Sequence, residues 1–172
     1  MTSFLLSALV AKFRGAALDD FRPVHRHCWL VWEPGVWRPP SGHETLPAVR
    51  LPTPALSAGE ALAIALSPRP GSGGQLTVGR SPANDVEIND GTLSQLHLLL
   101  MEQAPLRWTV RDAGSKNGSW LDGARLVPGL PAPLADGSRI QAAQVCLTFY
   151  EPPGMLQRLQ SQVVARSISQ PT

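Results

Sequence analysis

The sequence predicts an all-β fold, an antiparallel β-sandwich, with a helical and strand extension before it and a short helix after it. From residue 60 to residue 151, short stretches of branched and aromatic residues alternate with turn signals, and no helical periodicity separates them. The chain has 172 residues, 43% of them hydrophobic, which suits one domain of ordinary size with extensions. We therefore divide it into an N-terminal extension (1–59), a sandwich (60–151) and a C-terminal amphipathic helix with a tail (152–172).

Residues 3–20 are expected to form a helix, because Leu5, Leu9 and Phe13 recur at helical spacing. A short further turn would stop at Pro23. Such a helix either covers a sheet edge or a core face, or binds a partner. We favour the covering role, since an isolated helix of this length is marginal in water without tertiary contacts.

A strand is predicted over residues 28–32, which are rich in aromatic and branched side chains. His25, His27 and Cys28, with His43 as a fourth ligand, form a conceivable metal site. However, successive strand residues point to opposite faces, which would separate His27 from Cys28. We therefore predict no metal and no cofactor.

The remaining chain divides into a linker and the sandwich strands. Residues 38–59 are rich in proline, serine and glycine, which predicts a linker or an extended strap. Asp122-Gly123 is a two-residue hairpin signal within the sandwich. The predicted strands cover residues 61–66, 75–78, 86–88, 97–102, 107–111, 119–121, 124–127 and 139–150.

The composition argues against several classes of protein. A formal charge of +2 without a dense basic tract gives no support for nucleic-acid binding. No apolar run approaches the ~20 residues of a membrane helix. The apolar start is followed, not preceded, by Lys12 and Arg14, which is the wrong polarity for a signal peptide. Cys28 and Cys146 lie far apart and match no metal spacing, as expected of a reduced cytoplasmic protein.

Two polar stretches stand at the ends of predicted strands. The first contains Gly79-Arg80 and, further along, Ser94-x-x-His97; the second covers residues 112–118. Together they offer a guanidinium, hydroxyls, amides and a lysine to a single site. A guanidinium with hydroxyl and backbone N–H donors around it suits a phosphate dianion.

The order of these motifs resembles the forkhead-associated (FHA) domain, a reader of phosphothreonine peptides. The resemblance covers about residues 61–150, and its strength lies in the ordered set rather than in any single motif. The sequence supplies, in the family's order, Gly79-Arg80, Asn84-Asp85, Ser94-x-x-His97, Asp112-x-Gly114-Ser115-x-Asn117-Gly118, Asp122-Gly123 and Asp136-Gly137.

The resemblance implies roles for the first stretch. Arg80 would contact the phosphate, and Ser94 would donate its hydroxyl to it. Gln95 would add an uncharged N–H donor, a weaker contact than the basic residue often found there. His97 would brace the loops, and Gly79 belongs to the same structural motif.

The second stretch departs from the family at one position. Lys116 stands where the family usually has threonine, and its ammonium can reach the same anion without copying a hydroxyl. Asn117 would hydrogen-bond the ligand backbone after the phosphothreonine, while Gly118 serves the turn. The alternative for Lys116 is a solvated loop lysine without a ligand, and the alternative for Asn117 is an asparagine that only forms the turn. Ser138 replaces an acidic residue that is common in the family, at a distance from the site.

The resemblance therefore implies a phosphothreonine-dependent protein–protein interaction module in Ser/Thr kinase signalling, with a phosphothreonine-containing protein or peptide as its partner. The alternative is a phosphate-independent scaffold or assembly protein that uses the same fold and the N-terminal extension. An enzyme is not expected, because Ser94, His97 and Cys146 match no nucleophile elbow, Walker loop or zinc protease motif.

Overall fold

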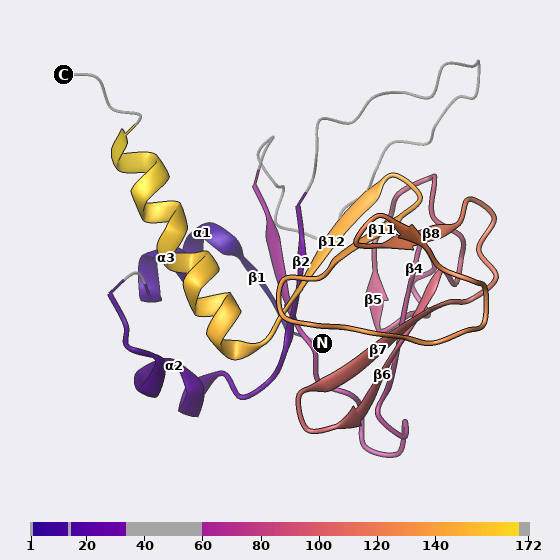
Figure 1. Ribbon diagram of the computed structural model, residues 1–172, viewed down its shortest axis with the longest axis horizontal. Coiled ribbons are helices and arrows are strands. Elements are labelled where there is room, and N and C mark those ends of the chain that lie inside the picture. Colours follow the sequence, from indigo (N-terminus) through magenta and orange to yellow (C-terminus); the bar gives the residue numbers. More distant parts are fainter. Residues whose placement is uncertain (1, 14, 34–59, 169–172) are drawn as a thin grey trace.

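The computed structural model of the protein describes residues 2–13, 15–33 and 60–168, and the side chains up to residue 161. The predicted linker, including His43, lies outside the described residues. Two β-sheets pack face to face, and three helices cover the outer face of one of them (Figure 1). The predicted β-sandwich is therefore confirmed. The division of the chain into three parts stays a prediction.

The larger sheet has seven strands, and every neighbouring pair in it is antiparallel. Its edges are formed by the first and the ninth strand of the chain. In spatial order the strands are β1 (Ser3–Leu5), β3 (Leu62–Ala65), β2 (Trp29–Trp32), β12 (Val145–Tyr150), β11 (Arg139–Ala142), β8 (Ser119–Leu121) and β9 (Ala124–Arg125).

The smaller sheet has five strands. In spatial order they are β10 (Ala132–Pro133), β7 (Arg107–Asp112), β6 (Leu98–Ala104), β4 (Gln75–Gly79) and β5 (Val86–Glu87). The pair β4–β5 is parallel, which departs from the expected antiparallel pairing. The loop between the two strands folds back along β4, where Asp85 is hydrogen-bonded to Thr77, so the chain enters β5 in the direction of β4.

The space between the sheets is filled by the first hydrophobic core. Alternate residues of β4 and β6, such as Val78 and Leu100, point inward as the period of two requires. Leu30 of β2 and Phe149 of β12 meet them from the other sheet and are fully buried. The predicted strands therefore provide both inner faces of the sandwich.

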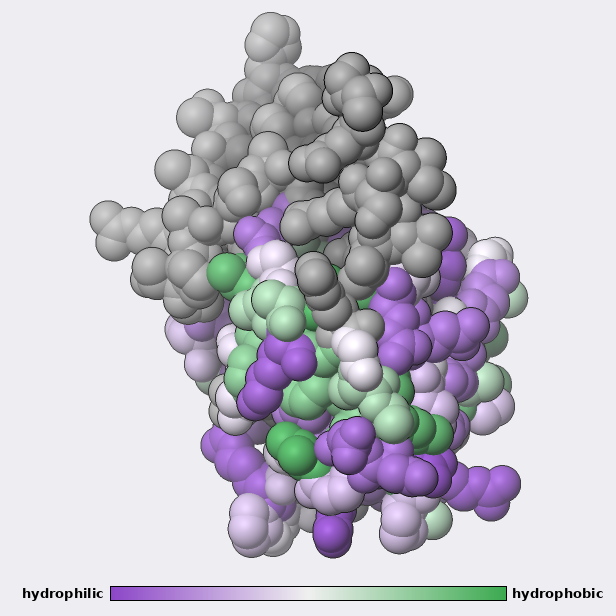
Figure 2. Space-filling model, turned by 90° about the vertical axis from the view of Figure 1, so that its left-hand side faces the viewer, coloured by the Kyte–Doolittle hydropathy of each residue, from purple (hydrophilic) through white to green (hydrophobic). Residues whose placement is uncertain are grey.

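A second hydrophobic core lies on the outer face of the seven-stranded sheet, under the helices α1 (Leu6–Phe13), α2 (Leu18–Val24) and α3 (Pro152–Ile168). Trp29 and Val31 point to this side while Leu30 points to the sandwich core, so β2 is buried on both faces. This double burial explains why its sequence is a continuous apolar run. Figure 2 faces the helical side, where hydrophobic side chains gather in the middle of the coloured surface and hydrophilic side chains lie beside and below them.

The N-terminal segment differs from the single helix expected over residues 3–20. Ser3–Leu5 form a strand, because pairing with β3 supplies backbone hydrogen bonds that an isolated segment lacks. Pro23 lies inside α2 rather than beyond it, one residue before the helix ends. The expected covering role is confirmed, since the large apolar side chains of α1 are buried in the second core.

Helix α3 is fixed at both its start and its middle. The Asp136 carboxylate accepts the Glu151 N–H at 2.9 Å and lies against Gly154, where an added Cβ would overlap it. Further along, the Arg158 guanidinium pairs with Glu33 at 2.7 Å. The predicted amphipathic character is confirmed by buried Met155 and Leu159. No helix among the described residues is long and apolar enough to cross a membrane.

Two histidines are packed into the second core. The His25 ring contacts Phe13, Phe21 and Trp29 at centroid distances of 4.8–5.2 Å, and neither of its nitrogens has a hydrogen-bond partner among the described residues. His27 lies beside them, with its ring 4.5 Å from that of Trp29. No group of three or more potential metal ligands occurs in the described residues. Both rings act as aromatic core residues there.

These histidines predict an acid-sensitive fold. Burial lowers the pKa of His27 from 6.5 to about 4, with the neighbouring His25 adding to the effect, and burial also lowers the pKa of His25. As the pH falls below 6.5, His27 is therefore protonated in the unfolded chain but stays neutral in the folded one. We expect the free energy of unfolding to have its highest value above that pH and to decrease as the pH falls toward about 4.

Urea denaturation at several pH values in this window measures the effect. His27→Gln, which removes one titrating group, should flatten the slope of stability against pH. His97, whose pKa is also lowered by burial, leaves some slope in the variant. Identical slopes for the wild type and His27→Gln would contradict the assignment.

Candidate functional site

Three loops meet at one end of the sandwich: the loop after β4, the loop before β6 and the loop after β7. The Arg80 N–H donates to the Ser94 carbonyl at 3.0 Å, which joins the first loop to the second. The Lys116 N–H donates to the Ser94 hydroxyl oxygen, also at 3.0 Å, which joins the second to the third. Backbone atoms thus bring the predicted residues of all three loops together.

Arg80 follows directly after β4 and its side chain is exposed. No hydrogen bond or ion pair to its guanidinium occurs among the described residues. Gly79 is required before it because the chain runs close to the second loop. A Cβ at this position would overlap the Gln95 carbonyl oxygen and lie 2.9 Å from Nδ2 of Asn84. The glycine therefore permits the contact that fixes the Arg80 backbone.

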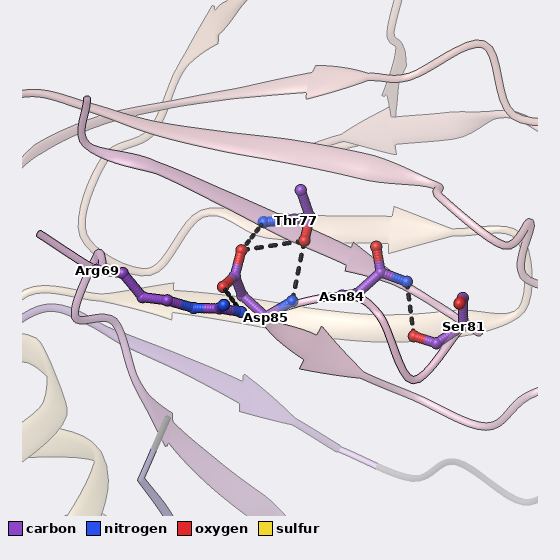
Figure 3. A network of polar contacts seen from close by, with 5 residues as sticks. All are labelled: Arg69, Thr77, Ser81, Asn84 and Asp85. Atoms are coloured by element: carbon purple, nitrogen blue, oxygen red, sulfur yellow. Dashed lines mark hydrogen bonds and ion pairs between the residues drawn. The ribbon is translucent and has the colours of Figure 1, made fainter. Parts of the chain in front are cut away.

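The first loop is braced by two side chains (Figure 3). Asp85 accepts hydrogen bonds from the N–H and the hydroxyl of Thr77 at 2.9 and 3.0 Å, and it pairs with Arg69 at 2.5 Å. Burial alone would raise the pKa of the Asp85 carboxyl, but these partners outweigh it and lower that pKa.

Asn84 holds the other side of the same loop. Its Nδ2 group donates to the carbonyls of Ser81 and Gln95 at 2.8 and 2.6 Å. The Asn84-Asp85 pair therefore shapes the loop that presents Arg80.

His97 connects the second loop to the third by hydrogen bonds. Its ring is fully buried, and Nδ1 accepts the Ser94 N–H at 3.0 Å. The ring proton therefore lies on Nε2 and points at the Gly118 carbonyl, 3.2 Å away. Burial lowers the pKa of His97, although the Gly118 carbonyl and the Asp112 charge oppose the shift, so the ring is neutral at pH 7.

Asp112 organises the third loop from a buried position, with only 1% of its surface exposed. Its carboxylate accepts the N–H groups of Gly114 and Ser115 at 2.8 Å each and the Ser115 hydroxyl at 2.7 Å. The Ser119 hydroxyl donates to it as well. Burial alone would raise the pKa of this carboxyl, but the hydrogen bonds lower it, so the group is ionised at neutral pH.

The three remaining predicted residues lie at the rim. Gln95 and Lys116 have exposed side chains, and neither side chain forms a hydrogen bond or ion pair within the described part of the chain. Asn117 is also exposed, and its Nδ2 donates to the Thr92 carbonyl at 2.7 Å. Gly118 has a φ of +80°, a conformation that favours glycine in this turn. The prediction that Gly118 serves the turn is therefore supported by its geometry.

The arrangement is suited to an anion. Arg80 and Lys116 supply positive charge, and the Ser94 hydroxyl can donate outward because its oxygen already accepts the Lys116 N–H. The nearest carboxylate in the third loop, Asp112, is buried and turned toward its own hydrogen-bond donors. Arg80 and Lys116 therefore present positive charge outward from the first and the third loop.

Two features of the site were not singled out by sequence reasoning. Asp112 was noted only as part of a motif, although its position just before a Gly-Ser pair is a signal for a side chain that accepts loop N–H groups. Arg125 was not considered at all. Its Nη2 atom lies 3.4 Å from the position of a Cβ on Gly118, so the side chain borders the third loop.

Comparison with protein families agrees with this geometry. The family model described as FHA domain matches residues 76–143, which includes all three loops. No curated protein sequence matched the chain.

Solved structures are similar in fold. An FHA domain of an Arabidopsis thaliana hypothetical protein is 24% identical, over 74% of this chain and 87% of that one, with a TM-score of 0.50. The N-terminal FHA domain of Saccharomyces cerevisiae Rad53p, solved with a phosphothreonine peptide, is 18% identical. The match covers 77% of this chain and 98% of that one, with a TM-score of 0.50. Mycobacterium tuberculosis EmbR, solved with a low affinity phosphopeptide, is 22% identical. The match covers 45% of this chain and 20% of that one, with a TM-score of 0.42. The chain thus spans only a fifth of that last protein.

The hydrogen bonds of Asp112 predict a graded loss of stability. Asp112→Ala should lower the free energy of unfolding by about 2–4 kcal/mol, because charged hydrogen bonds contribute ~1.5–3 kcal/mol each and the buried Ser119 hydroxyl loses its acceptor. Asp112→Asn retains one acceptor oxygen and should lose less. Chemical denaturation of both variants measures the difference, and equal stability of wild type and Asp112→Ala would refute the role.

Proposed function

Since the chain carries an FHA domain over residues 76–143, we propose that it binds phosphothreonine in a partner protein. The observation that carries this proposal is the exposed Arg80 guanidinium, which has no hydrogen bond or ion pair among the described residues and whose backbone N–H is bonded to the Ser94 carbonyl. A phosphothreonine brings about −1.5 to −2 charges and three acceptor oxygens. An arginine and a hydroxyl that are already in place supply donors without ordering a loop first.

The contacts differ in strength. Arg80 supplies charge-assisted hydrogen bonds, and Ser94 supplies a neutral one. Lys116 adds a mobile ammonium from the third loop, where its exposed side chain is free to move toward the anion. Gln95 adds an uncharged donor at the rim. Arg80 therefore carries most of the binding free energy contributed by the phosphate.

Asn117 is proposed to hold the backbone of the ligand. Its Nδ2 donates one N–H to the Thr92 carbonyl, so its second N–H and its side-chain oxygen are left for the ligand. This oxygen can accept an N–H from an extended peptide next to the phosphothreonine. The contact to Thr92 keeps the side chain in one orientation, which reduces the entropy lost on binding.

The proposed context is Ser/Thr kinase signalling in the cytoplasm, because the phosphothreonine must be made by such a kinase. The yeast Rad53p domain of the same fold was solved with a phosphothreonine peptide. Binding, rather than catalysis, is the proposed activity. The competing function is a scaffold that binds its partner equally well with and without phosphate.

The proposal predicts that Arg80→Ala weakens binding of phosphothreonine peptides by about 10- to 100-fold, the equivalent of a lost charged hydrogen bond. Fluorescence anisotropy with a degenerate phosphothreonine peptide library and its unphosphorylated twin measures this. Gln95→Ala should cause a smaller loss, because the Gln95 side chain is uncharged.

Arg107→Ala is the matched control. Arg107 is an exposed arginine at the start of β7, whereas the third loop follows the end of that strand. The control removes the same charge and should bind like the wild type. Equal binding of the phosphorylated and unphosphorylated libraries by the folded protein would favour the scaffold and reject the proposed function.

A further inference from the structure

We propose that Arg125, whose guanidinium lies over the Trp120 ring, forms a second anion contact next to the phosphothreonine site. This inference rests on the proposed function. It assigns to the ligand a second acidic group, a carboxylate or a phosphate, close to the phosphothreonine. The protein would then select phosphothreonine within an acidic or doubly phosphorylated segment.

The position of Arg125 is set by a tight hairpin. Asp122 and Gly123 have φ values of +49° and +86°, as a two-residue type I′ turn requires, and they confirm the predicted hairpin. The turn places Arg125 directly opposite Trp120 in the β8–β9 pair. Both side chains therefore lie on the same face of the sheet.

Trp120 gives the arginine a defined place. The Arg125 guanidinium carbon lies 5.9 Å from the centre of the Trp120 ring, within the range of a cation–π contact. Such a contact holds the planar guanidinium while its N–H groups still point to solvent. An exposed arginine on an aromatic ring loses less conformational entropy on binding than a freely mobile one.

This cation borders the phosphate-binding loops. Nη2 and Nε of Arg125 lie 3.4 and 3.6 Å from the position that a Cβ on Gly118 would take. Gly118 directly follows Asn117, the residue proposed to hold the ligand backbone, and its carbonyl accepts the His97 hydrogen bond. The guanidinium is therefore next to the third loop, not on a distant surface.

The charge of Arg125 is not neutralised within the described residues. The ion pairs there are Arg69–Asp85 and Arg158–Glu33, and neither includes Arg125. The acidic residue of its own hairpin, Asp122, accepts hydrogen bonds from the Arg139 N–H and the Ser138 hydroxyl at 2.7 and 3.2 Å. Among residues 2–13, 15–33 and 60–161, no anion pairs with the exposed Arg125.

The geometry determines which ligands benefit. An extended peptide advances ~3.3 Å per residue, so residues close to the phosphothreonine pass the third loop when Asn117 holds the backbone. A carboxylate or phosphate on such a residue offers two oxygens, which the guanidinium can bind in a bidentate manner. A neutral side chain there gains nothing from Arg125.

The test compares four sets of otherwise identical peptide libraries. One set carries a single phosphothreonine among neutral residues, one adds an aspartate scanned along the peptide, one adds a second phosphothreonine scanned likewise, and one is unphosphorylated. Anisotropy titrations use the full chain, Arg125→Gln and the control Arg107→Gln. Thermal unfolding of each variant checks that it is folded.

The inference predicts that at least one scanned acidic group improves binding by about three- to tenfold, the range of an exposed to partly shielded charged contact. This gain should disappear in Arg125→Gln and persist in Arg107→Gln, and Arg125→Gln should weaken binding of the acidic libraries more than binding of the neutral phosphothreonine library. The aspartate and second-phosphothreonine arms identify whether a carboxylate or a phosphate is preferred.

Two results would overturn the inference in different ways. If phosphate-dependent binding is present but the acidic gain is absent or survives in Arg125→Gln, the second contact is rejected and the proposed function stands. If the neutral phosphothreonine library binds no better than the unphosphorylated one, the proposed function fails and this inference fails with it.

Discussion

The site depends on one buried carboxylate, that of Asp112. It lies at the end of β7 in the smaller sheet and binds the Ser119 hydroxyl at the start of β8 in the larger one. The same group holds the N–H groups of the third loop. A buried charge is costly unless hydrogen bonds compensate it, so the loop and the second sheet must stay in place around Asp112. The packing of the two sheets and the shape of the site are therefore linked.

The helical layer is built into the fold through the centre of the larger sheet. Strand β2 lies between β3 and β12, and it sends Leu30 into the sandwich core and Trp29 into the second core. Most apolar side chains of α1 are thereby used inside the protein. A scaffold that used this segment would need exposed apolar residues, but those of α1 are in large part already buried. The loops at the end of the sandwich are therefore the better candidates for a binding site.

Local signals predicted much of the fold and of the candidate site. Gly79, Arg80, Ser94 and Asn117 follow from short motifs, because turns and loop contacts depend on neighbouring residues. The strand at Ser3–Leu5 did not follow, since its pairing partner lies far along the chain. Arg125 was missed for another reason: the hairpin was predicted, but the approach of the Arg125 side chain to Gly118 depends on how the third loop folds against it. Contacts of this kind need the three-dimensional structure.

The central claim is that the three loops act as one phosphothreonine site. NMR mapping of backbone amide shifts tests it most directly, with labelled protein titrated with the phosphothreonine peptide library and with its unphosphorylated twin. The account predicts that the largest shifts occur at residues 80–81, 94–95 and 115–118, and only with the phosphorylated library. Equal shifts with both libraries, or shifts confined to the helical layer, would contradict it.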